Sequence, residues 1–134
     1  MNDCIFCKII KGEIPSYKIY ENQYAYAFLD IAGDIDGHTL VVPKKHCTNI
    51  LDCNDKDLSE VMKVVKLISN HYIKNCGYEG VNILNANDKS AQQSVFHLHF
   101  HIIPRKTNDG ENGFPNFSGA KNEIAEMHKL LTIN

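Results

Sequence analysis

Between residues 93 and 105 the sequence alternates histidine with large apolar side chains. The histidines are His97, His99 and His101. Successive side chains of a β-strand point to opposite faces, so a strand over 95–103 places all three imidazoles on one face. The other face, directed into the core, carries Phe96, Leu98, Phe100 and Ile102. The pattern therefore predicts a sheet that carries a row of imidazoles on one face.

Three interpretations of this row are open. A half-exposed strand that carries histidine by chance is disfavoured, because three consecutive alternate positions are histidine in a chain with seven histidines. A single zinc site is difficult, because His97 and His101 lie about 13 Å apart on an extended strand and zinc–nitrogen bonds of about 2.0 Å leave little slack. Catalysis is the third: a neutral imidazole whose other nitrogen is held by a hydrogen bond can attack phosphorus. Such an arrangement suits nucleotidyl transfer to water.

The rest of the chain predicts one α+β domain over residues 1–134. A long central helix is expected over 55–76, with Asn54 as N-cap and Gly77 as the stop. Its apolar face consists of Leu58, Val61, Met62, Val65, Ile68 and Tyr72. A mainly antiparallel sheet of about five strands, a short N-terminal helix and a C-terminal helix complete the fold. The strands are expected at 17–20, 24–29, 39–42, 80–84 and 95–103.

Composition restricts the class of partner. The chain has 14 Lys and Arg against 16 Asp and Glu, a net charge of −2, so it has no strongly basic surface to hold a nucleic-acid polymer. Its apolar runs are far shorter than the roughly 18 residues that span a bilayer, and charges occupy the place of a signal-peptide core. We therefore expect a cytoplasmic protein that binds small molecules and no membrane.

Several segments together resemble the histidine triad (HIT) superfamily of nucleotide hydrolases and transferases, in its Hint-like branch. The resemblance covers residues 1–105, whereas 106–134, a C-terminal loop and helix, have little motif support. It implies the HIT fold, a homodimer, and hydrolysis of purine nucleoside phosphoramidates to the nucleoside monophosphate. Two alternatives are hydrolysis of diadenosine polyphosphates and a zinc-stabilised nucleotide-binding or scaffold protein with weak catalysis. The matching segments are 4–10, 14–15, 27–31, 37–46 and 93–105.

The resemblance also implies roles for four histidines. His99 is the nucleophile that forms a nucleotidyl-histidine intermediate on the α-phosphate. His101 contacts the phosphate and the leaving group, and His97 orients the neighbouring ring. His38 is a further histidine close to the triad.

The same resemblance implies a nucleotide site. Asp30 accepts hydrogen bonds from the ribose hydroxyls, as suits a group that has only acceptors. Gln93 and Ser94 donate hydrogen bonds to phosphate oxygens. Apolar side chains that could equally belong to the core match the walls around the purine, and these are Ile5, Phe6, Ile9, Phe28 and Ile31.

The chain contains five cysteines, two of them in the motif Cys4-x-x-Cys7. This motif alone suits zinc, a redox pair or two thiols in a helix, and the surrounding sequence lacks the βαβ pattern of a thioredoxin-like redox site. Hint-like proteins that carry the motif imply one structural zinc per chain, bound by Cys4, Cys7, His46 and His97. Such a closed site would brace the fold and leave the other triad histidines for catalysis. Cys47 could compete with His46 as a ligand.

The chain departs from the family pattern in the approach to the triad. The family commonly has glycine at the positions of Asp88 and Gln92, and asparagine at that of Ala86. If either glycine serves a turn with positive φ, the loop must be rebuilt around a Cβ atom. These departures therefore bear on the affinity for substrate and on the range of leaving groups.

Overall fold

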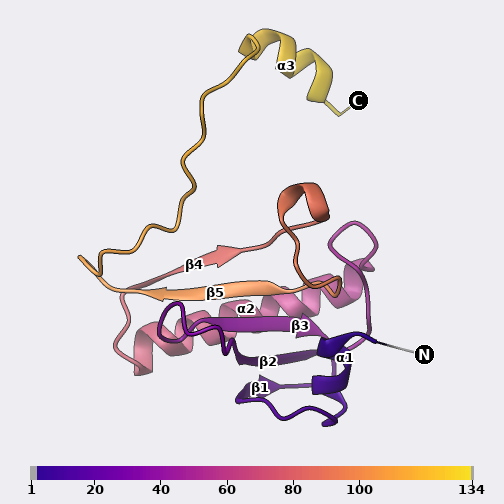
Figure 1. Ribbon diagram of the computed structural model, residues 1–134, viewed down its shortest axis with the longest axis vertical. Coiled ribbons are helices and arrows are strands. Elements are labelled where there is room, and N and C mark those ends of the chain that lie inside the picture. The colour runs from indigo at the N-terminus through magenta and orange to yellow at the C-terminus, as the bar shows by residue number, and fades with distance from the viewer. Residues whose placement is uncertain (1–2, 134) are drawn as a thin grey trace.

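The computed structural model describes residues 3–133 and shows an α+β fold built on one five-stranded antiparallel sheet, as predicted. Helix α2 crosses one face of the sheet (Figure 1). The order of the strands across the sheet is β1-β2-β3-β5-β4. The elements are α1 (Ile5–Ile10), β1 (Lys18–Glu21), β2 (Ala25–Leu29), β3 (Thr39–Pro43), α2 (Asp55–Asn75), β4 (Gly80–Leu84), the 3₁₀ turn η1 (Lys89–Ala91), β5 (Phe100–Arg105) and α3 (Ile124–Leu131).

Helix α2 begins and ends close to where the sequence predicts. The Asn54 side chain accepts a hydrogen bond from the Asp57 N–H, which satisfies one of the free donors of the first turn. Gly77, with φ +82°, ends the helix. The apolar face differs in one respect: Val64 is buried, whereas Met62 remains 39% exposed.

Strands β2 and β3 are buried on both faces because helices cover both. Ala25, Ala27 and Val41 face the core beneath α2. The alternate side chains of the same strands face a second cluster, which also contains Phe6 and Ile9 of α1. The strand members of this second cluster are Tyr26, Phe28, Leu40 and Val42. The short helix α1 is therefore fixed against the strands that lead to the site.

The strand predicted over 95–103 is shorter and begins later, at Phe100. The preceding residues leave the sheet because their backbone groups bond elsewhere: the Leu98 N–H donates to the Cys47 carbonyl, and the His99 carbonyl accepts from the Asn85 amide. Phe96 was expected in the core and is instead 43% exposed. The strand continues through Pro104 to Arg105, because at Pro104 it pairs only with β4.

The C-terminal segment is the least integrated part of the chain. Residues 106–123 lead away from the sheet to α3, which lies apart from it (Figure 1). Its side chains Ile124, Leu130 and Leu131 are 86%, 73% and 68% exposed. Among the residues described, no helix is both long enough and apolar enough to cross a membrane.

The loop between β4 and β5 carries two strained backbone positions. Asp88 has φ 83° and ψ 164°, and Gln92 has φ 71° and ψ 28°. These conformations favour glycine, because a Cβ atom at positive φ approaches the neighbouring carbonyl. The positive φ angles implied by the family glycines are thus kept here by residues that carry a Cβ atom.

This strain predicts that Gln92→Gly is stabilising. The Gln92 side chain is exposed, so its removal mainly relieves the strain, and the free energy of unfolding should rise by about 1 kcal/mol. The matched control is Ala91→Gly in η1, which has no strain to relieve and should lose about 0.5–1 kcal/mol. Urea denaturation measures both. Stabilisation by neither variant, or by both equally, would contradict the strain.

Candidate active site

Three histidines form a group where the chain enters β5, and a fourth, His97, comes just before His99 in the chain. His97 and His99 lie in the irregular segment before the strand, His101 is in β5, and His38 ends the loop before β3. The ring centroids of His99 and His101 are 4.9 Å apart, and those of His38 and His101 are 5.1 Å apart. His97 is separated from this group and belongs to the cysteine cluster described below.

The His99 ring is held by one hydrogen bond. Its Nδ1–H donates to the His97 carbonyl at 2.8 Å, so the neutral ring carries its lone pair on Nε2. His99 is 5% exposed, and burial is the main cause that lowers its pKa. An oriented neutral imidazole with one free nitrogen is the form that can act as a nucleophile.

His101 and His38 form a hydrogen-bonded pair, with 2.8 Å between His101 Nδ1 and His38 Nε2. Burial, together with the neighbouring His99 and His38, lowers the pKa of His101 to about 4. In the free protein at neutral pH His101 is therefore uncharged. A bound phosphate anion would offset this effect and favour its imidazolium form.

Asp30 follows β2 and lies beside this pair. Its Oδ2 is 3.7 Å from His38 Nε2, and its Oδ1 accepts a hydrogen bond from the Ala32 N–H at 2.9 Å. The side chain is 23% exposed, so it can be reached from solvent. Asp34, which the sequence analysis did not single out, contacts the other nitrogen of His38.

The five apolar residues expected around the purine divide into two groups. Phe6 is buried and its ring lies edge-on to His99, with 5.2 Å between centroids, and 5.5 Å from Phe28. Ile9 and Phe28 are also buried, whereas Ile5 and Ile31 are 47% and 84% exposed. The structure thus places a packed aromatic wall beside His99 and two exposed apolar side chains farther out.

Gln93 and Ser94, the residues expected to bind phosphate, differ in their surroundings. The buried Gln93 amide donates to the carbonyls of Thr48 and Val95 and accepts from the Asp88 N–H. Asn49 adds a fourth hydrogen bond to the same side chain. Gln93 therefore ties two loops together, whereas Ser94 lies exposed on the loop.

The sequence analysis missed the residues that complete this bracing. Asn85 donates to the His99 carbonyl at 2.9 Å, and Asn87 donates to the Asn85 side chain. The Asn87 side chain also accepts from the Ile50 N–H. The only signal in the sequence was that Asn85 and Asn87 flank Ala86.

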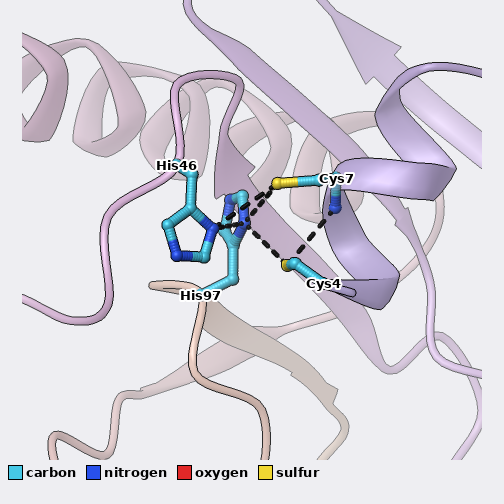
Figure 2. A group of neighbouring side chains, drawn as sticks. All are labelled: Cys4, Cys7, His46 and His97. Carbon is cyan, nitrogen blue, oxygen red and sulfur yellow. Dashed lines mark hydrogen bonds between the residues drawn. The ribbon is translucent and has the colours of Figure 1, made fainter. Parts of the chain in front are cut away.

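The predicted zinc ligands are brought together in one group (Figure 2). Figure 2 shows Cys4 at the start of α1, Cys7 on α1, His46 on the loop after β3, and His97, with the ligand atoms directed toward one another. The His46 and His97 Nδ1 atoms are 3.1 Å apart, and the Cys4 and Cys7 Sγ atoms lie 3.3 and 3.5 Å from His97 Nδ1.

These separations lie within, or about 0.2 Å below, those expected around a tetrahedral zinc ion. Bonds of about 2.3 Å to sulfur and 2.0–2.1 Å to nitrogen place ligand atoms about 3.3–3.8 Å apart. His97 Nε2–H donates to the Pro43 carbonyl at 2.8 Å, which leaves Nδ1 as the ligand atom. Cys47 lies in the core beneath α2, outside this group, and burial raises the pKa of its thiol.

Comparisons with known proteins show which family the chain is similar to. The family model described as HIT domain matches residues 11–108. An adenosine 5'-monophosphoramidase of Saccharomyces cerevisiae is 39% identical over 130 residues, which are 96% of this chain and 80% of the relative.

Two solved structures extend the comparison. A HIT family protein from Bacillus anthracis is 38% identical and superposes with a TM-score of 0.83 over 96% of this chain and 92% of the other. A zinc-bound histidine triad family protein from Mycobacterium smegmatis is 32% identical, with a TM-score of 0.77 over 85% of this chain and 83% of the other. The family model and the similarity to these relatives show that the chain belongs to the HIT domain family and is a HIT-family hydrolase.

Proposed function

We propose that this protein hydrolyses purine nucleoside phosphoramidates to the nucleoside 5'-monophosphate and an amine, through a nucleotidyl intermediate on His99. The observation that carries the proposal is the orientation of His99, whose Nδ1–H is held by the His97 carbonyl. The relative named as an adenosine 5'-monophosphoramidase supports the choice of substrate.

In the first step, His99 Nε2 attacks the α-phosphorus and forms a phosphorus–nitrogen bond. The bond from phosphorus to the leaving nitrogen breaks, and its electron pair stays on that nitrogen. The His101 imidazolium, favoured by the bound phosphate, supplies a proton from Nε2 to the departing amine. His99 then carries the nucleotide and His101 is neutral.

In the second step, a water molecule attacks the same phosphorus. His101 Nε2 accepts the proton of the water, and the bond between phosphorus and His99 breaks. The products are the nucleoside monophosphate and the starting forms of both histidines. One water is consumed and one amine is released in each cycle.

The remaining residues bind and hold the nucleotide in this proposal. Asp30 accepts from the ribose hydroxyls, since its carboxylate is reachable from solvent beside His38. Phe6 and Phe28 form the inner wall for the purine, with Ile9 packed behind and Ile5 and Ile31 at the exposed rim. Ser94 donates to a phosphate oxygen, and Gln93 shapes the loop that presents it.

Zinc is proposed as a structural ion held by Cys4, Cys7, His46 and His97. When bound there, zinc supplies a cross-link that joins α1 to the loop after β3 and to the segment before β5. A site filled by four protein ligands offers no position for substrate. His97 thus supports catalysis through its carbonyl, which orients His99, while its ring belongs to the metal site.

The charges around the site favour an amine over a polyphosphate as leaving group. The exposed loop next to His38 carries the carboxylate of Asp34, which would repel a polyanionic leaving group. Diadenosine polyphosphates are therefore the less suited substrate class.

A substrate panel tests this choice. We expect kcat/KM for adenosine phosphoramidate to exceed that for diadenosine triphosphate by at least about tenfold, because juxtaposed like charges cost 1.4 kcal/mol or more. The reverse order would support the polyphosphate alternative. Binding of AMP without turnover of either substrate would contradict the proposed function and support a nucleotide-binding or scaffold protein.

A further inference from the structure

The loop between β2 and β3 places a carboxylate against the far side of His38. Asp34 Oδ1 and Oδ2 lie 2.9 and 3.1 Å from His38 Nδ1. The loop is closed by hydrogen bonds from the Asp30 N–H to the His38 carbonyl and from the Ile35 N–H to Asp34 Oδ1. The Asp34 side chain is 56% exposed, whereas that of His38 is 9% exposed. A surface carboxylate therefore reaches a buried imidazole at the active site.

This contact fixes where His38 carries its proton. An ionised carboxylate only accepts hydrogen bonds, so His38 Nδ1 must be the N–H. The hydrogen bond with His38 is the main cause that lowers the pKa of Asp34, which keeps the carboxylate ionised at neutral pH. In the neutral ring, His38 Nε2 then has a lone pair. That lone pair faces His101 Nδ1 at 2.8 Å.

The tautomer of His38 in turn sets the tautomer of His101. Because His38 Nε2 accepts the hydrogen bond, His101 Nδ1 must donate it. The nitrogen of His101 that can gain or lose a proton is therefore Nε2. We propose that Asp34 is a positioning residue, which sets the tautomers of His38 and His101 through two successive hydrogen bonds and so directs His101 Nε2 to the reacting atoms. This inference rests on the proposed function, in which His101 Nε2 gives and takes the proton.

The chain of contacts also stabilises charge. When His101 is an imidazolium, its Nδ1–H still donates to His38, and the carboxylates of Asp34 and Asp30 both favour the positive ring, whereas His99 and His38 disfavour it. From the largest to the smallest, the influences on the pKa of His101 are burial, His99, His38, Asp30 and Asp34. Loss of the Asp34 charge should therefore make the imidazolium of His101 less stable and its proton easier to lose.

The same loop offers a matched control. Asp34 and Asp36 both line a surface cavity of about 430 Å³, which also includes Tyr78 and Pro104. Both carboxylates are exposed, but it is Asp34 that accepts the hydrogen bond from His38 Nδ1–H. Asp36→Asn removes one negative charge from the loop and leaves that hydrogen bond in place.

The test compares Asp34→Asn with Asp36→Asn in the full-length protein. An amide has the shape of the carboxylate but can donate to His38 Nδ1, so it no longer fixes the tautomer. We expect ¹⁵N NMR of histidine-labelled protein to show His38 as the Nδ1–H tautomer in the wild type and in Asp36→Asn. In Asp34→Asn the Nε2–H tautomer of His38 should appear.

The kinetic part of the test uses adenosine phosphoramidate. In Asp34→Asn, kcat should fall by about 10–100-fold with little change in KM, as for other residues that orient a reacting side chain. The basic limb of the pH profile of kcat should also move to lower pH, because the proton of His101 is held less firmly. Asp36→Asn should match the wild type in both respects.

Unchanged tautomers in Asp34→Asn, or equal kinetics and pH profiles for the two variants, would overturn the inference. If the wild type itself turned over no phosphoramidate, the proposed function would fail by that result alone. The NMR comparison would still decide whether Asp34 sets the tautomers, because it requires no substrate.

Discussion

Replacement of His99 by alanine should reduce turnover of adenosine phosphoramidate on the order of 10⁴-fold or more, because no other group can form the nucleotidyl intermediate. The imidazole is held in the reactive tautomer by the His97 carbonyl, and Phe6 packs against its ring. Loss of a nucleophile affects the chemical step, so affinity for AMP should change by no more than about threefold. Steady-state kinetics and calorimetric titration with AMP measure the two effects.

The matched control is His71→Ala. His71 lies exposed on α2 and contacts the Asn75 side chain, far from the triad in the sequence and on another element. Its removal should leave kcat unchanged. Comparable turnover by wild type and His99→Ala would exclude the covalent mechanism, and loss of AMP binding in His99→Ala would show that the variant has lost the site rather than the nucleophile.

Replacement of Cys7 by serine should reduce the zinc content from about one per chain to far less, and should lower the melting temperature by about 10 °C. A structural zinc site contributes directly to folding free energy, and each kcal/mol corresponds to several degrees in a domain of this size. Cys7 Sγ lies 3.5 Å from both His46 Nδ1 and His97 Nδ1, so its loss opens the group on the side of α1. Metal analysis of protein purified without added zinc, with calorimetry, measures both.

Cys76→Ser is the control for loss of a thiol. Cys76 is exposed at the C-cap of α2, outside the cysteine and histidine group. The Cys76→Ser variant should keep the zinc content and the melting temperature of the wild type. A chelator should bring the wild type down to the stability of Cys7→Ser and leave that variant unaffected. Zinc content that is low in the wild type and the same in Cys7→Ser would disprove the metal site.

Most of the fold could be predicted because it follows from local patterns. The strand Gly80–Leu84 and the helix that begins after Asn54 were both placed correctly, since periodicity and capping act over a few residues. The strand predicted over 95–103 was wrong at both ends, because β5 begins at Phe100 and ends at Arg105. Its alternation is consistent with an extended chain, but alternation alone cannot reveal that the Leu98 N–H bonds to Cys47 rather than to a neighbouring strand.

The candidate site was predictable where a motif marked it. The structure groups Cys4, Cys7, His46 and His97, which the resemblance had placed together from segments far apart in the chain. Asp34 was missed although it precedes His38 by only four residues, because its role depends on how the loop turns. The retrospective signal is an Asp-x-x-x-His spacing in a loop bounded by Gly33 and Gly37, both with positive φ.

The homodimer expected from the resemblance stays a prediction, as does the cytoplasmic location. The exposed apolar side chains of α3 and of the segment before it, among them Phe114 and Phe117 at 77% and 85%, show that this part of the chain buries little against its own domain.

The configuration at phosphorus tests the central claim most directly. A single diastereomer of an adenosine thiophosphoramidate, hydrolysed in ¹⁸O-labelled water, reports the number of displacements at that atom. Attack by His99 followed by attack by water inverts the phosphorus twice, so we predict retention of configuration in the product. Inversion would show that water attacks the substrate directly and would contradict a nucleotidyl intermediate on His99.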